Sequence, residues 1–151
     1  MAAGNIERFN VLVGAIFARL YQEFPVAIEL QLEDFEEQMA VNRPERDGDE
    51  YHIRRDAVFF VSTVIWLSNH GYLDSGSQLS NGTVMGCVMT ARTLELLKAM
   101  PSNLENKDPS LGDQLVSATK EGMTGKVKEL ASDFLTKAVA FGTKTATDWA
   151  L

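Results

Sequence analysis

The sequence predicts a mainly α-helical chain with a small β-hairpin, followed by a long amphipathic C-terminal helix. Three observations support this prediction. Apolar residues recur at helical spacing in several stretches, the dipeptide Asn81-Gly82 favours a tight hairpin turn, and a polar segment precedes the last helical stripe. We therefore divide the chain into a domain at residues 5–100, a linker at 101–111 and a helical segment at 112–151.

The first forty residues predict a helix, a short strand and a second helix. Apolar side chains recur at helical spacing between residues 5 and 24, with Asn5 as the N-cap and Pro25 ending the helix. Residues 26–32 alternate between apolar and polar, which is typical of a strand. A short acidic helix at residues 32–40 then leads into a polar loop.

The next sixty residues predict a long helix, a hairpin and another helix. The long helix extends from about Tyr51 to His70, and Gly71 suits a left-handed C-terminal cap. Asn81-Gly82 predicts a two-residue hairpin turn, because both central positions of such a turn need positive φ. Thr90 is placed to cap the helix that follows.

The C-terminal segment carries one apolar stripe with mixed charges around it. From Met123 to the end a continuous helix would be roughly 40 Å long, whereas a small domain is about 30 Å across. The helix can pack on its own domain or pair with a second copy, and its length favours a homodimer with Phe134 and Phe141 near the centre of the interface. The stripe comprises Leu115, Val127, Leu130, Phe134, Ala138, Phe141, Thr145 and Trp149.

Two short motifs add a resemblance to this order of elements. "LSNHGYL", at the end of the long helix, resembles the end of the recognition helix in MarR-like and PadR-like regulators. "VMTARTLELLKAM" resembles the segment that follows the wing in the same proteins. Residues 5–100 thus resemble a winged helix-turn-helix domain. The resemblance implies DNA binding, with the long helix in the major groove.

The charge of the chain opposes that implication. The net charge is −7, and residues 1–100 hold fourteen acidic against eight basic side chains, a balance of −6. Affinity for nucleic acid comes largely from cations that neutralise phosphates. Residues 33–37, on the helix that would cross the phosphate backbone, include four acidic side chains.

The long helix itself leaves two functions open. If Leu67, Gly71 and Leu73 anchor the core, then Phe60 and Val64 also point inward, and the opposite face offers Phe59, Ser62, Thr63 and Trp66. Phe59 and Trp66 either pack against the first or last helix of the same chain or contact another protein, because a helix that is apolar all round is usually buried. We expect a protein-interaction module or adaptor, whose contact residues would be Phe59, Trp66, Phe134, Phe141 and Trp149. In the alternative, a DNA-binding transcriptional regulator, the contacts would come from Arg54, Arg55, Ser62, Thr63 and Arg92.

No motif for catalysis or for a cofactor accompanies these surfaces. The two histidines and Cys87 lack the spacing of metal ligands, and no nucleophile motif is present. A single cysteine fits a reducing compartment, and the longest uncharged run is too short for a membrane span. We therefore expect a cytoplasmic, non-enzymatic protein without a cofactor or metal.

Overall fold

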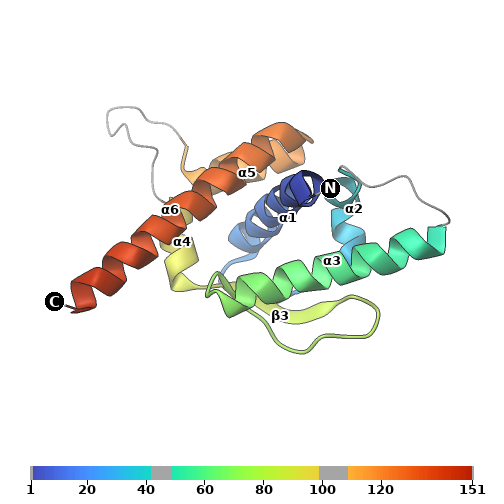
Figure 1. Cartoon of the computed structure of the whole chain (residues 1–151), viewed down its shortest axis with the longest axis horizontal. Helices are drawn as coiled ribbons and strands as arrows, with labels where there is room; N and C mark the ends of the chain where they lie inside the picture. Colours follow the sequence, from blue (N-terminus) through green and yellow to red (C-terminus); the bar gives the residue numbers. More distant parts are fainter. Residues whose placement is uncertain (1, 42–48, 99–108, 151) are drawn as a thin grey trace.

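The computed structural model describes the backbone of residues 2–41, 49–98 and 109–150, and the side chains of residues 4–41, 55–98 and 109–138. Helices dominate these residues, and a small three-stranded antiparallel sheet accompanies them, as the sequence predicts (Figure 1). In chain order the elements are α1 (Ala2–Glu23), β1 (Ile28–Leu30), the 3-10 helix η1 (Leu32–Phe35), α2 (Glu36–Met39), α3 (Asp49–Asn69), β2 (Leu73–Asp74), β3 (Val84–Met89), α4 (Ala91–Lys98), α5 (Leu111–Lys120) and α6 (Thr124–Ala150).

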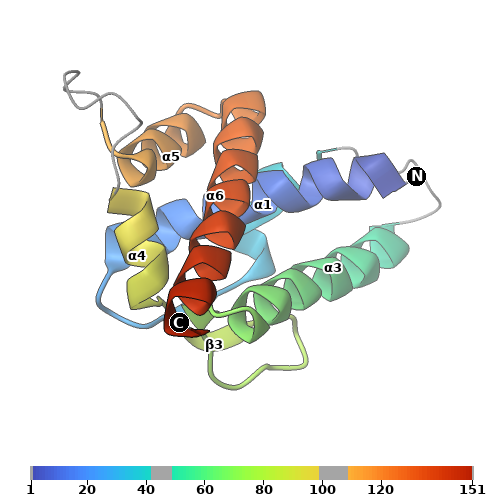
Figure 2. The same cartoon turned by 60° about the vertical axis from the view of Figure 1, so that its left-hand side comes forward.

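Helix α1 is the central element and lies between α3 on one side and α5 and α6 on the other (Figure 1 and Figure 2). Residues 11–18 are all buried, because neighbouring elements cover every face of these two turns. A helix that is covered all round must be apolar all round, which explains the composition of this stretch. The helix predicted at residues 5–24 is confirmed, but it begins at Ala2, so that Asn5 lies inside it rather than at its N-cap.

The sheet has the strand order β1-β3-β2, and β3 bends at a bulge. Ile28 pairs with Cys87 and Leu30 pairs with Val84, so β3 has one residue more than β1 between the two pairs. Gly86 lies in this interval with a φ of 63°, a left-handed conformation that glycine adopts without a steric penalty. The extra residue changes the register between β3 and β1 and bends β3 locally.

The hairpin that joins β2 to β3 ends in a turn at Asn81-Gly82. Gly82 has a φ of 88°, and the side-chain oxygen of Asn81 accepts a hydrogen bond from the N–H of Thr83 at 3.1 Å. The N–H of Leu79 donates to the carbonyl of Thr83 at 2.8 Å, which leaves three residues in the loop. The predicted turn is therefore present, but it is one residue longer than a two-residue turn.

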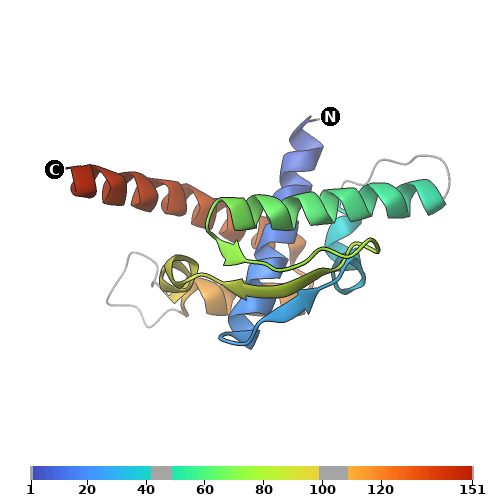
Figure 3. The same cartoon turned by 90° about the horizontal axis from the view of Figure 1, so that it is seen from below.

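Helix α3 runs alongside the hairpin and crosses α1 (Figure 3). Phe60, Val64 and Leu67 are completely buried, which confirms the inward face inferred from the sequence. Gly71 ends the helix with a φ of 79°, and the N–H of Tyr72 donates to the carbonyl of Leu67 at 2.9 Å. This is the predicted left-handed cap.

Helices α5 and α6 pack against α1 within the same chain. Phe134 is completely buried, and its ring lies 4.8 Å from the ring of Phe17 in an edge-to-face contact. Gly14 permits the close approach of α6, since a Cβ atom there would lie 2.5 Å from Cγ1 of Val127. Up to Ala138 the apolar stripe of the C-terminal segment is thus covered in cis, and residues 5–98 share one hydrophobic core with residues 111–138.

Beyond Ala138 the backbone of α6 continues as a helix to Ala150 and projects away from the other elements (Figure 1 and Figure 3). Helix α4 meets α6 near the start of this projection, where Nη2 of Arg92 donates to the carbonyl of Ala138 at 3.0 Å. The side chains of Phe141 and Trp149, which the sequence assigns to a dimer interface, lie outside the described residues, as does most of the predicted linker.

Candidate functional site: an apolar groove between α1 and α3

The N-terminal turns of α1 and the middle of α3 enclose an open groove of about 320 Å³. The two helices cross (Figure 3). Its walls are apolar or uncharged. They are formed by Asn5, Ile6 and Phe9 of α1 and by Phe59, Ser62, Thr63 and Trp66 of α3. We call this surface the apolar groove.

Trp66 forms one wall of the apolar groove and is held by aromatic neighbours of its own chain. Its ring meets the ring of Phe9 edge to face at 5.4 Å, and it stacks on His70 at 4.1 Å and on Tyr72 at 5.8 Å. Even so, 38% of Trp66 remains exposed. The aromatic neighbours therefore orient the side chain, and part of its surface remains exposed to solvent.

Large apolar side chains are exposed on both helices that form the groove. Ile6 on α1 is 60% exposed, and Val58, on the solvent-facing side of α3, is 63% exposed. Ile6 and Trp66 line the apolar groove from its two helices, whereas Val58 lies outside the groove lining. Single exposed apolar residues are common on proteins, whereas a clustered set is typical of an interaction surface.

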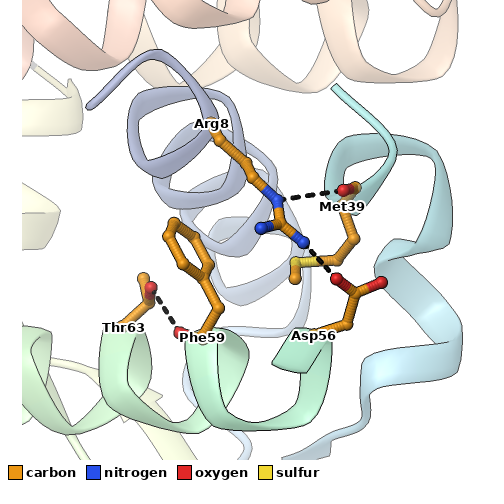
Figure 4. Close-up of polar contacts among 5 residues, drawn as sticks. All are labelled: Arg8, Met39, Asp56, Phe59 and Thr63. Carbon is orange, nitrogen blue, oxygen red and sulfur yellow. Dashed lines mark hydrogen bonds and ion pairs between the residues drawn. The ribbon is translucent and has the colours of Figure 1, made fainter. Parts of the chain in front are cut away.

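A buried polar clamp joins the two helices next to Phe59, one of the residues that line the groove (Figure 4). The guanidinium of Arg8 forms an ion pair with Asp56 of α3, and its Nε donates to the carbonyl of Met39 at 3.0 Å. The same guanidinium lies over the ring of Phe59, 4.5 Å from its centroid. Arg8 and Asp56 are both buried, so one side chain of α1 joins α2 and α3 through directional contacts.

The residues expected for DNA contact are dispersed or engaged elsewhere. Thr63 is buried, and its hydroxyl donates to the carbonyl of Phe59 at 2.8 Å. The guanidinium of Arg92 donates a hydrogen bond to the carbonyl of Ala138 in α6, and it also lies 5.2 Å from the centroid of the Tyr72 ring. Ser62 and Arg55 are exposed on α3, whereas the side chain of Arg54 lies outside the described residues.

The surface beside α3 is acidic. Four exposed carboxylates belong to η1 and α2, which precede α3 in the chain, namely Glu33, Asp34, Glu36 and Glu37. Along residues 55–69, Arg55 is the single basic side chain. A phosphate backbone laid along α3 would meet more negative than positive charge in this part of the chain.

Three of the five residues expected for protein contact have described side chains, and they divide into two groups. Phe59 and Trp66 line the apolar groove, but Phe134 is enclosed by Phe17 and Tyr72 in the core of its own chain. Phe134 is therefore unavailable as the centre of a surface for self-association. The groove residues Ile6 and Phe9 lie on α1 and were not identified from the sequence. The contact of Trp66 with Phe9 agrees with the interpretation that Phe59 and Trp66 pack against the first helix of their own chain.

The described residues show neither a metal cluster nor a reactive thiol. They contain no group of three or more His, Cys, Asp or Glu side chains arranged to hold a metal ion. Cys87 is buried in β3, and this burial raises the pKa of its thiol to about 11. At neutral pH the thiol is therefore protonated and a poor nucleophile. None of the described helices combines the length and apolarity that a membrane span requires.

Comparison with known proteins gives this chain no relative: no protein-family model, no curated protein and no solved structure matches it.

Proposed function

We propose that this chain is a non-catalytic, cytoplasmic interaction module of the winged-helix type, and that it binds a helical segment of another protein in the apolar groove. The order of the elements supports the winged-helix assignment, since a strand follows α1, two helices follow the strand, and a hairpin and α4 complete the order. Because fold does not determine function, the groove carries the functional part of the proposal.

The observation that carries the proposal is the exposure of Ile6 and Trp66 on facing walls of one preformed groove. An amphipathic helix commonly binds by placing apolar side chains, three or four residues apart, into such a groove. Aromatic side chains are frequent anchors at protein interfaces, because they bury a large area with little loss of conformational entropy. Trp66 is already oriented by Phe9 and Tyr72, which lowers the cost of binding further.

We also propose that the chain forms a homodimer through the part of α6 beyond Ala138. The projecting backbone of this part supports the proposal, as does the continued helical spacing of Phe141, Thr145 and Trp149 in the sequence. Sedimentation of the full chain beside a variant that ends at Ala138 tests it. A full chain that is monomeric at high micromolar concentration would refute the dimer.

The groove can be tested by selecting amphipathic helical peptides from a display library against the full chain. We expect the selected peptides to lose at least tenfold in affinity for Ile6→Ser, because this residue contributes an exposed wall of the groove. Val26→Ser is the matched control. Val26 is 61% exposed in the segment between α1 and β1, and it does not line the groove. Equal loss in both variants would contradict the assignment of the site.

The same preparation should bind random duplex DNA no more tightly than roughly 100 μM at physiological salt, the weak end of nonspecific binding. The reason is the excess of acidic over basic side chains in residues 1–100. Micromolar, salt-sensitive binding of the duplex in an anisotropy titration would favour the DNA-binding regulator over the interaction module.

A further inference from the structure

A second groove lies on the other side of the same turns of α1. It measures about 370 Å³ and is open to solvent between α1 and α6. In contrast to the apolar groove, its walls are polar and mostly charged. They are formed by Glu7, Asn10, Lys128, Glu129, Ser132 and Asp133. We call this surface the acidic groove.

The two grooves adjoin along the N-terminal turns of α1. Successive residues of a helix are rotated by about 100°, so Asn5 and Phe9 face α3 whereas Glu7 and Asn10 face α6. Ile6 lies between these two directions on the exposed ridge of the helix, and its 60% exposure agrees with that position. A ligand that covers Ile6 therefore reaches both grooves at once.

The acidic groove has a net negative charge. Its walls hold three carboxylates and one ammonium, a balance of −2. Nζ of Lys128 lies 3.9 Å from Oε1 of Glu7 in a partly exposed ion pair, so this lysine is already directed to one of the acids. Lys126 and Lys137 belong to the same helix but do not line the groove. The apolar groove has no charged side chain in its walls.

From this juxtaposition we propose that the partner is a basic amphipathic helix that lies across the first turns of α1. Its apolar side chains enter the apolar groove against Trp66, and the Lys or Arg side chains along one edge meet Glu129 and Asp133 in the acidic groove. This inference rests on the proposed function and adds the charge of the partner to it. Complementary charge of this kind speeds association and selects between partners more than it adds affinity.

A second copy of this chain fits the same surface poorly. Each copy carries a net charge of −7, and each would bring a surface with excess carboxylates to the acidic groove of the other. Like charges placed face to face oppose association. The contrast between an uncharged apolar groove and an acidic neighbour instead suits a ligand with one apolar face and one basic edge.

Three synthetic peptides test the inference with the full-length chain. Each has sixteen residues, a length of about 24 Å as a helix, with the same four leucines at helical spacing and with Lys, Gln or Glu at every polar position. Anisotropy of the fluorescein-labelled peptides measures binding at low and at high salt. We expect the Lys peptide to bind at least tenfold more tightly than the Gln peptide at low salt, and the Glu peptide not to saturate. High salt should reduce the difference between Lys and Gln.

Two matched double variants locate the charge effect. Glu129→Gln with Asp133→Asn should abolish most of the preference for Lys over Gln, whereas Glu33→Gln with Glu36→Gln removes the same charge from η1 and α2 and should leave the preference intact. Both pairs are exposed, so neither change should unfold the chain. If both double variants reduce the preference equally, the attraction is a general effect of net charge and the inference is wrong.

Ile6→Ser separates failure of the inference from failure of the proposed function. Binding of the Gln peptide that is lost in Ile6→Ser, without any preference for Lys, would overturn the basic partner and leave the apolar groove as a docking site. Absence of Ile6-dependent binding for the Lys and the Gln peptide alike would overturn the proposed function itself. A Lys preference that requires Ile6, Glu129 and Asp133 together supports both.

Discussion

Replacement of Arg8 should lower the free energy of unfolding substantially, although Arg8 lies near the N-terminus of α1. In Arg8→Met, Asp56, which is 6% exposed, loses its ion pair with the guanidinium of Arg8. Breaking one partner of a buried ion pair costs about 3–5 kcal/mol. The carbonyl of Met39 also loses its hydrogen-bond donor, for about 1 kcal/mol more. Urea unfolding followed by circular dichroism measures the change in the free energy of unfolding.

A double-mutant cycle distinguishes the ion pair from loss of packing. Arg8→Met removes the ion pair of the Asp56 carboxylate with Arg8, and Asp56→Leu removes that buried carboxylate. The double variant should therefore be more stable than Arg8→Met alone. Arg8→Lys serves as a second variant that should fold, since it keeps the charge and loses the two-partner geometry of the guanidinium. Losses that simply add in the double variant would refute the argument, because independent sites are additive.

Three other changes test packing, the groove and the buried thiol. Gly14→Ala should destabilise the chain by about 1–3 kcal/mol through the clash with Val127, whereas Gly125→Ala, with nothing within 4 Å of the new Cβ, should cost less than about 0.5 kcal/mol in the same urea titration. Trp66→Ala should lower the free energy of unfolding by about 2–3 kcal/mol, which is less than for a fully buried aromatic residue because 38% of Trp66 is exposed. A decrease below about 1 kcal/mol would contradict the packing of Trp66 within the chain. The Cys87 thiol should react with a disulfide reagent at pH 8 about 100-fold more slowly in the folded chain than in urea, because its pKa is raised to about 11; equal rates would refute its burial. The pKa of Cys87 is higher in the folded chain than in the unfolded chain. The contribution of the neutral Cys87 thiol to the free energy of unfolding is therefore complete below about pH 9 and is lost as the pH rises toward 11.

The sequence predicted best those features that depend on local spacing. Phe60 and Val64 were placed inward by helical periodicity, and Gly71 was identified as a cap by the need for positive φ; the structure confirms both. The position of the hairpin turn was also predicted correctly, whereas its length was predicted as two residues and is three. Turn length depends on the pairing of Leu79 with Thr83, which the dipeptide Asn81-Gly82 does not determine.

The apolar groove could not be predicted, because it depends on how α1 crosses α3. Arg8 and Asp56 are separated by 48 positions, and no periodicity relates them. One signal was available: Arg8 precedes Leu12 by four residues, on the inward side of α1, and a cation at such a position indicates a buried partner. The placement of Phe134 at the centre of a dimer interface was wrong for a similar reason, since the stripe is covered within the chain as far as Ala138.

The clamp and the groove are two parts of one arrangement. Apolar packing alone would allow crossed helices to shift along each other, whereas the contacts of Arg8 with Asp56 and Met39 are directional and fix their separation. Phe59, below the guanidinium, belongs to both the clamp and the groove wall. A variant that weakens the clamp while the chain stays folded should therefore bind helical peptides more weakly, although Arg8 does not line the groove. The groove remains open because α6 packs on the opposite side of α1 and cannot fill it (Figure 1 and Figure 2). Helix α3 thus buries Phe60, Val64 and Leu67 in the core, while Trp66 lines the groove in which we propose that a partner helix binds.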